Sequence, residues 1–155
     1  MAENNEELTG FGVVIKNDDG SDYVTLDDKA VKFVEFKLDT VEENVEDRSD
    51  DVINVITIKG NITPDTKDKV RKLALWAKEK QRNKVYKSVE VTLKTGGITL
   101  REYNLNFAFC VDYTETFRSG RDAKELKQGN TFELIISQRK DDLDGLDIYS
   151  VGKDE

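Results

Sequence analysis

The sequence predicts a mainly β fold, either a small β-barrel or a rolled two-sheet sandwich, with one flanking α-helix at about residues 64–82. Three observations lead to this class. Short runs rich in β-branched and aromatic residues recur along the chain, and such runs are typical of strands. Only one segment has the apolar period of an amphipathic helix. Two strands change the phase of their alternation part-way, as bent strands do in barrels and orthogonal sandwiches.

The first element is an N-terminal hairpin. Residues 11–16 (FGVVIK) and 22–26 (DYVTL) have strand composition, and NDDG between them is a strong turn sequence. The next strand, 31–38, changes the phase of its apolar positions at Val34, which predicts a β-bulge there. The strand at 53–59 changes phase in the same way between Val55 and Ile56.

A long acidic loop separates these two strands. Residues 39–51 carry seven acidic side chains against Arg48, so their net charge is 1 − 7 = −6. Val41 and Val45 are too sparse to anchor an amphipathic helix. We expect this loop to be mobile in an isolated subunit, because it repels itself and has little apolar surface to bury. It is either ordered by a neighbouring subunit or a solvated loop without a partner.

The predicted helix has clear boundary signals. Thr63 is suited to the N-cap and Pro64 to the first helical position, where its missing N–H costs nothing. The apolar face is narrow, with Trp76 at its border, so we expect the helix to pack on the outside of a sheet. The apolar stripe comprises Val70, Leu73, Ala74 and Ala77, and the basic last turn comprises Lys78, Lys80 and Arg82.

The second half of the chain is again rich in strands. Residues 85–94 and 98–104 flank a Gly-Gly turn and predict a hairpin. In 105–113 the odd positions are all large and apolar, which predicts a central core strand. A polar connection at 114–130 leads to a strand at 132–139 and an edge strand at 146–151. The predicted core comprises Phe33, Phe36, Ile56, Ile58, Leu73, Val89, Val91, Phe107, Phe109, Val111, Phe132, Leu134 and Ile136.

Charge is segregated along the chain. Residues 67–87 hold nine basic and two acidic side chains, giving +7, and residues 141–155 sum to −5. One interpretation is solvated faces on a soluble domain. The other is heterologous association, in which a basic surface on one copy meets an acidic surface on the next and the contacts close into rings or extend as filaments. The candidate interface residues are Glu42, Glu43, Glu46, Asp47, Asp50 and Asp51 in the acidic loop, and Lys67, Lys69, Arg71, Lys72, Lys78, Lys80 and Arg82 in the basic helix region.

Composition excludes several function classes. The chain has no histidine and one cysteine, which removes Ser-His-Asp and Cys-His catalysis, His-ligated metal sites and disulfide scaffolds. No catalytic, cofactor-binding or metal-binding residue can be named, and we expect no enzyme activity. A net charge of −8 gives no general attraction to nucleic acid. No run approaches the roughly 20 apolar residues of a membrane-spanning helix. The N-terminus lacks the features of a signal peptide, so we expect cytoplasmic synthesis and assembly.

The order of elements resembles a known family. The predicted strand at 53–59 leads into TIKGNI (57–62), which is followed by the predicted helix and by a hairpin across TGG (95–97). After the hairpin come the segments REYNLNFAFCVDYTETF (101–117) and TFELIISQRKD (131–141). Over about residues 31–140 this resembles the tube proteins of contractile injection machines: the haemolysin-coregulated protein (Hcp) of type VI secretion and related phage-tail and bacteriocin tube proteins, with the Gram-positive phage-like branch the most similar. The acidic loop and the N-terminal hairpin depart from the Hcp pattern.

The resemblance implies a small β-barrel with one flanking helix and no catalytic residues. It also implies rings of about six copies that stack into a tube, with sheath, baseplate or spike proteins and cargo as further partners, and release as part of a particle. We therefore expect one domain over 1–155, with charged tails at about 1–9 and 152–155, that acts as a structural tube subunit. The alternative is a small soluble β-barrel that binds an apolar ligand or a protein partner. A carrier needs an internal cavity of about 300 Å³ or more, whereas a tube subunit has a filled interior.

Overall fold

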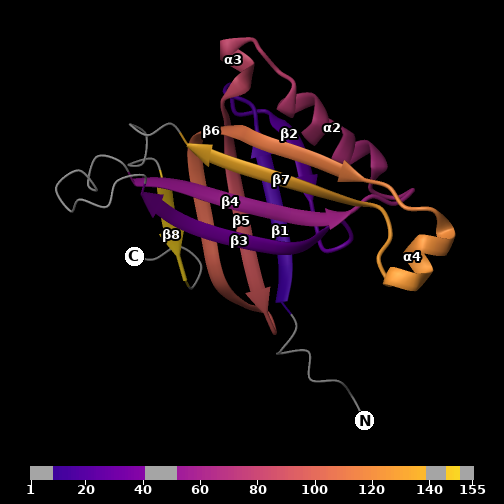
Figure 1. Cartoon of the computed structure of the whole chain (residues 1–155). Helices are drawn as coiled ribbons and strands as arrows, with labels where there is room; N and C mark the ends of the chain where they lie inside the picture. The colour runs from indigo at the N-terminus through magenta and orange to yellow at the C-terminus, as the bar shows by residue number, and fades with distance from the viewer. Residues whose placement is uncertain (1–8, 41–51, 139–145, 151–155) are drawn as a thin grey trace.

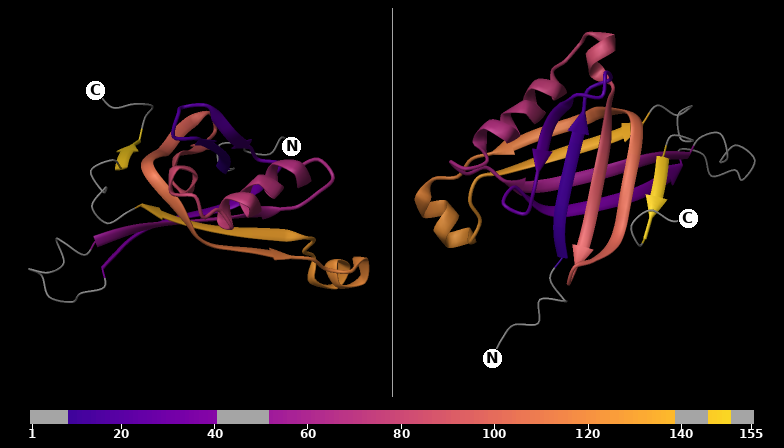
Figure 2. Two further views of the ribbon diagram at one scale, coloured as in Figure 1. Left: turned by 90° about the horizontal axis from the view of Figure 1, so that it is seen from above. Right: turned by 180° about the vertical axis from the view of Figure 1, so that it is seen from behind.

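Two layers of antiparallel strands pack face to face, and the strands of one layer run across those of the other (Figures 1 and 2). The computed structural model describes residues 9–40, 52–138 and 146–150. Within these residues the strands join in the order β2-β1-β5-β6-β7-β4-β3, with β8 on β6. This is the predicted rolled two-sheet sandwich. The strands are β1 (Thr9–Lys16), β2 (Asp22–Leu26), β3 (Val31–Thr40), β4 (Val52–Asn61), β5 (Lys87–Thr95), β6 (Ile98–Thr116), β7 (Thr131–Gln138) and β8 (Leu146–Tyr149), and the helices are α2 (Lys67–Ala77), α3 (Arg82–Val85) and α4 (Gly120–Leu126).

The long strand β6 belongs to both layers. Its first half pairs with β5, its second half pairs with β7, and Ala108 pairs with Lys87 on one side and Gln138 on the other. Just before this point Phe107 has a φ of 56°, and the register with β5 shifts. An extra residue in one strand of a pair bends that strand and increases its twist. The bulge therefore lets β6 turn from one layer into the other (Figure 2).

The same bulge changes which β6 side chains face the core. Leu105 and Ala108 are buried, Phe109 is half-buried, and Phe107 and Val111 are exposed. The prediction that all odd positions of 105–113 share a core face is therefore right only at the two ends of that strand. Each extra residue shifts the period-two alternation by one position, and a second register shift lies between positions 110 and 112.

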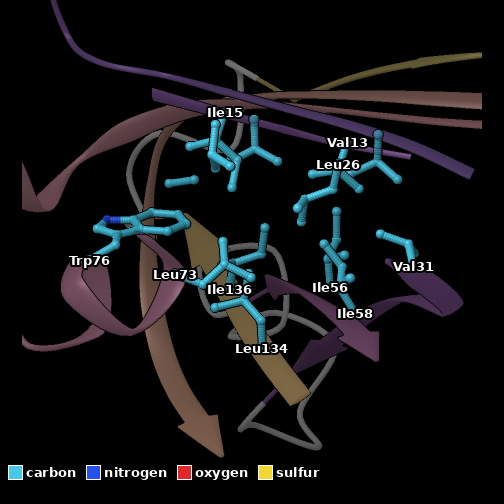
Figure 3. Close-up of a cluster of buried hydrophobic side chains, with 14 of the residues drawn as sticks. Val13, Ile15, Leu26, Val31, Ile56, Ile58, Leu73, Trp76, Leu134 and Ile136 are labelled. Carbon is cyan, nitrogen blue, oxygen red and sulfur yellow. The ribbon is translucent and has the colours of Figure 1, made fainter. Parts of the chain in front are cut away.

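The core lies between the two layers and beneath α2 (Figure 3). Eight of the thirteen predicted core residues are buried, which is fewer than two-thirds and reflects the strand-phase errors. β1 and β2 also contribute buried residues that the predicted core did not include, among them Val13, Ile15 and Leu26. The eight are Ile56, Ile58, Leu73, Val89, Val91, Phe132, Leu134 and Ile136; Phe36 and Phe109 are half-buried, and Phe33, Phe107 and Val111 are exposed.

Of the two phase changes predicted for the earlier strands, one lies at a different position and the other is absent. In β3 the register shifts between Val31 and Phe33, so the bulge precedes Val34. In β4 the pairing is regular through Val55 and Ile56, and no bulge is present there. The β4 alternation looks interrupted in the sequence because one of its core positions is polar.

That polar core position is Asn54, of which 1% is exposed. Its Nδ2 donates to Gln138 Oε1 at 2.5 Å, and its Oδ1 accepts from the backbone N–H of Gln138 at 3.0 Å. The hydroxyl of Ser137 donates to the Asn54 carbonyl oxygen. Buried polar groups are tolerated when they are hydrogen-bonded in this way. β4 and β7 are therefore joined by side chains as well as by their backbone ladder.

The main helix is shorter than the predicted 64–82. The backbone N–H groups of Thr66 and Lys67 both donate to the Thr63 carbonyl oxygen, at 3.1 and 2.8 Å, in a turn that precedes α2. Thr66 is therefore the N-cap, and Pro64 lies outside the helix. α2 ends at Ala77, so the basic residues predicted for its last turn, Lys78, Lys80 and Arg82, follow it.

Other predicted boundaries move as well. The N-terminal hairpin is confirmed as β1 and β2, whereas β5 begins at Lys87, after the short helix α3. The connection predicted at 114–130 contains the end of β6 and helix α4. Of the predicted acidic loop, residues 39–40 belong to β3, and residues 41–51 lie outside the described residues. Apart from Thr9, the predicted tails also lie outside them.

Candidate assembly surfaces

The basic helix region lies on α2 and on the segment that follows it. α2 buries Val70, Leu73 and Trp76 against β2 and β6. Since one side of the helix faces the core, the intervening basic positions face solvent. All seven residues that the sequence predicts here are exposed: Lys67, Lys69, Arg71, Lys72, Lys78, Lys80 and Arg82.

Two of these residues also have contacts within the subunit. Lys67 Nζ lies 3.2 Å from Asp68 Oδ1 in an exposed pair, which contributes little stability. Lys72 Nζ donates to the Tyr23 carbonyl oxygen at 3.0 Å, and the Tyr23 hydroxyl donates to the Lys72 carbonyl oxygen at 2.6 Å. These two hydrogen bonds fasten α2 to β2, so Lys72 supports the fold in addition to supplying charge.

Lys87 is the one buried basic residue within 67–87. Only 6% of it is exposed, and its Nζ donates to Asn17 Oδ1 at 2.8 Å. Burial lowers the pKa of Lys87, an effect that the charge of Glu79 partly offsets. Lys87 is not among the predicted interface residues. The available signal was its position, because Lys87 has the same parity in β5 as the core residues Val89 and Val91.

A surface cleft of about 640 Å³ opens beside Lys87. The β1–β2 hairpin forms one wall, with Asp19 from its turn and Tyr23 from β2, and the α2–α3 segment forms the other, with Trp76 and Glu79. This cleft is open to solvent and bears charged groups, unlike the enclosed apolar cavity of a ligand carrier. Between the two layers, fully buried side chains such as Ile15, Leu26 and Ile56 occupy the interior (Figure 3).

The predicted acidic partner surface lies outside the described residues. This applies to all six of its members: Glu42, Glu43, Glu46, Asp47, Asp50 and Asp51. A contact between this loop and the basic helix region of another copy therefore stays a prediction.

Among the described strands, one layer has an unpaired edge on each side. In the layer β6-β7-β4-β3, β3 pairs only with β4 among the described strands, and beyond Ala108 β6 pairs only with β7. α2 lies on the inner side of this layer (Figure 2). Unpaired backbone N–H and C=O groups at a sheet edge can accept a strand from another chain. Sequence patterns do not reveal these edges, because strand order depends on contacts between distant segments.

The described residues offer little reactive chemistry. No group of three or more Cys, Asp and Glu side chains among them is placed to hold a metal ion. No helix in the described ranges is long and apolar enough to cross a membrane. The half-buried Cys110 has its pKa raised to about 11, mainly by burial and further by the charge of Asp112, so its thiol is protonated at neutral pH.

Known structures share this architecture over most of the chain. A crystal structure of an Hcp protein superimposes with a TM-score of 0.58 and 9% identity over 85% of this chain and 88% of that chain. This chain has the Hcp fold. Hcp1 from Flavobacterium johnsoniae matches with a TM-score of 0.50 and 21% identity, over 85% of this chain and 90% of that chain. The resemblance drawn from the sequence is thus confirmed for the fold.

The Hcp fold also occurs in larger assemblies. A chain from the sheath–tube complex of an extracellular contractile injection system, PVC, matches with a TM-score of 0.53 and 15% identity, over 91% of this chain and 88% of that chain. No protein-family model matches the sequence, and no curated protein matches it.

Proposed function

We propose that this chain is a structural subunit that assembles into rings, and that the rings stack into the tube of a phage-tail-like contractile injection particle. The observation that carries this proposal is the layer β6-β7-β4-β3, in which the described strands leave a different edge unpaired on each side. Two unlike edges on opposite sides of one layer favour head-to-tail contacts, which close into rings or extend into filaments. The Hcp fold supports this role.

The finer details of the assembly are part of the same proposal. The resemblance to Hcp-like tube proteins supports rings of about six copies, a role without catalysis, and release as part of a particle. It also supports contacts with sheath, baseplate or spike proteins and with cargo. The match to a chain of a sheath–tube complex supports a place beside a sheath.

Charge supplies a second contact within this proposal. The exposed basic helix region of one copy meets the acidic loop 39–51 of another copy. Raising the ionic strength from about 0.05 M to about 1 M shortens the Debye length to about 3 Å and weakens such a contact. Sedimentation should therefore show less assembly at high salt. Assembly that is independent of salt would show that apolar contacts dominate instead.

Electron microscopy of the concentrated, purified full chain in negative stain tests the proposed function directly. We expect rings, or tubes of stacked rings. The companion measurement is sedimentation velocity over a concentration series. A chain that stays monomeric throughout that series, with no rings on the grid, would contradict the proposed function.

A further inference from the structure

We propose that the α4 arm of one subunit docks on the β8 edge of a second copy of this chain. The α4 arm comprises residues 117–130, which connect β6 to β7. The β8 edge comprises β8 itself together with Glu90 and Glu102 on the neighbouring strands. This inference rests on the proposed function and identifies the two surfaces of one of its subunit contacts.

The α4 arm has a shape fixed by its own hydrogen bonds. At its base the backbone N–H of Arg118 donates to Asn130 Oδ1 at 2.9 Å, and Arg118 Nη1 donates to the Gly129 carbonyl oxygen at 3.0 Å. Ser119 Oγ accepts from the backbone N–H of Asp122 at 3.2 Å and caps the helix. A preorganised element loses little conformational entropy when it binds. The arm is therefore ready to dock as a unit.

Two large apolar side chains project from this arm. Phe117 is 64% exposed and Leu126 is 62% exposed. α4 buries none of its own residues, so the arm makes no contribution to the subunit core. Exposed apolar anchors on a rigid protrusion are typical of a binding element, and a few such residues carry most of the binding energy of an interface.

The charge of the arm favours an acidic partner. Its four basic and two acidic residues give 4 − 2 = +2. Arg121 and Glu125 form an exposed ion pair at 3.4 Å. Complementary charge steers association and sets the orientation of the partners. The β8 edge of a second copy offers the opposite charge, in Glu90, Glu102 and Asp147.

The β8 edge has the matching combination of apolar and acidic groups. Asp147 is exposed and Ile148 is 45% exposed. Asn104 of β6 pairs with Asp147 on one side and with Glu90 on the other, and its Nδ2 donates to Glu102 Oε2 at 2.9 Å. Three carboxylates thus surround one position on one face of the sheet, and Ile148, the residue after Asp147, faces the other side of the same edge strand. No described strand pairs with the outer side of β8.

The α4 arm and the β8 edge lie at opposite ends of the subunit (Figures 1 and 2). A subunit therefore cannot reach its own β8 edge with its own arm. The contact must join two different surfaces of two copies. Such heterologous contacts generate closed rings or open filaments, which is the kind of contact that a tube subunit requires.

The first test removes the apolar anchors. The double variant Phe117→Ser/Leu126→Ser should fold normally, because both side chains are exposed, and its apparent association constant in sedimentation velocity should fall at least about tenfold. The matched control is Ile98→Ser, at an equally exposed position (63%) on the β5–β6 hairpin, which should leave assembly unchanged. Circular dichroism of each variant checks the fold.

The second test identifies the partner surface. Lys124→Glu and Asp147→Lys should each weaken assembly, and the two substitutions together should restore it. In a Cys110→Ala background, the pair Leu126→Cys and Ile148→Cys should give bismaleimide cross-links between copies, and neither single variant should do so.

The outcomes separate this inference from the proposed function. If the wild-type chain forms rings and the arm variants assemble equally well, the inference is wrong and the proposed function stands. If arm variants lose assembly but the charge exchange does not restore it and no cross-link forms, the β8 edge is not the partner. A wild-type chain that stays monomeric contradicts both.

Discussion

The ammonium of Lys87 lies 4.0 Å from the centre of the Tyr23 ring. A desolvated cation over an aromatic face is stabilised by the ring quadrupole, whose face has a negative electrostatic potential. The ammonium of Lys72 lies 5.7 Å from the centre of the same ring. Tyr23 of β2 therefore contacts both Lys72 of α2 and Lys87 of β5, and links these three elements.

Lys87 should give the stability of the chain a measurable pH dependence. Burial lowers its pKa in the folded state below the unfolded value of 10.5. Between these two values the unfolded chain binds more protons, so the free energy of unfolding contributed by this group rises with pH. In urea unfolding at increasing pH up to 10.5, the wild type should gain stability relative to Lys87→Met, by at most about 1.4 kcal/mol per pH unit. The exposed control Lys80→Met should track the wild type, and a difference of opposite sign would contradict the assignment.

Gly60 should tolerate no side chain. A Cβ at this position would lie 1.8 Å from the Ala30 carbonyl oxygen and 2.7 Å from the Phe132 ring. That carbonyl accepts from the backbone N–H of Asn61 at 2.8 Å, so it cannot move freely. Gly60→Ala should lower the free energy of unfolding by about 3 kcal/mol. Gly12→Ala, where no atom lies within 4 Å of the added Cβ, should change it by less than about 0.5 kcal/mol; equal effects would rule out the close approach.

Phe107 should be easier to replace by glycine than other exposed aromatics. Its φ of 56° is unfavourable for a side chain by about 1–2 kcal/mol, and glycine relieves this. Phe33 is similarly exposed (41% against 45%) but has no positive φ, so glycine there removes side-chain packing without relief. In urea unfolding, Phe107→Gly should be less destabilising than Phe33→Gly by about 1 kcal/mol or more. The reverse order would show that the bulge is unstrained.

Cys110 should react slowly with alkylating reagents. Its pKa of about 11, against 9.0 for an ordinary thiol, lowers the reactive thiolate fraction about 100-fold at a given pH near neutrality. Alkylation by iodoacetamide should therefore be at least about 100-fold slower in the folded chain than in the urea-unfolded chain. Equal rates would mean that the thiol is ionised or that its surroundings open readily.

Local sequence determined a large part of the fold. The β1–β2 hairpin follows from NDDG between two short strands, and the β5–β6 hairpin follows from Gly96 and Gly97, both of which have positive φ. Val70 and Leu73 face the core because helical periodicity is a property of near neighbours. Solvent exposure of Lys67, Lys69, Arg71 and Lys72 follows from the same periodicity. These features depend on interactions between residues that are close in the chain.

Tertiary structure alone decided the phase of β6 and the positions of its partners. The side chain of Gln138 donates through Nε2 to the Asn106 carbonyl oxygen at 2.6 Å, beside the bulge at Phe107. Nothing near Phe107 in the sequence signals a positive φ, because the group that holds the bulge comes from another strand. Strand order likewise leaves β3 and β6 at the edges of one layer among the described strands. It also places the α4 arm and β8 at opposite ends of the subunit (Figures 1 and 2). Strand order depends on contacts between residues far apart in the chain, which no local pattern encodes.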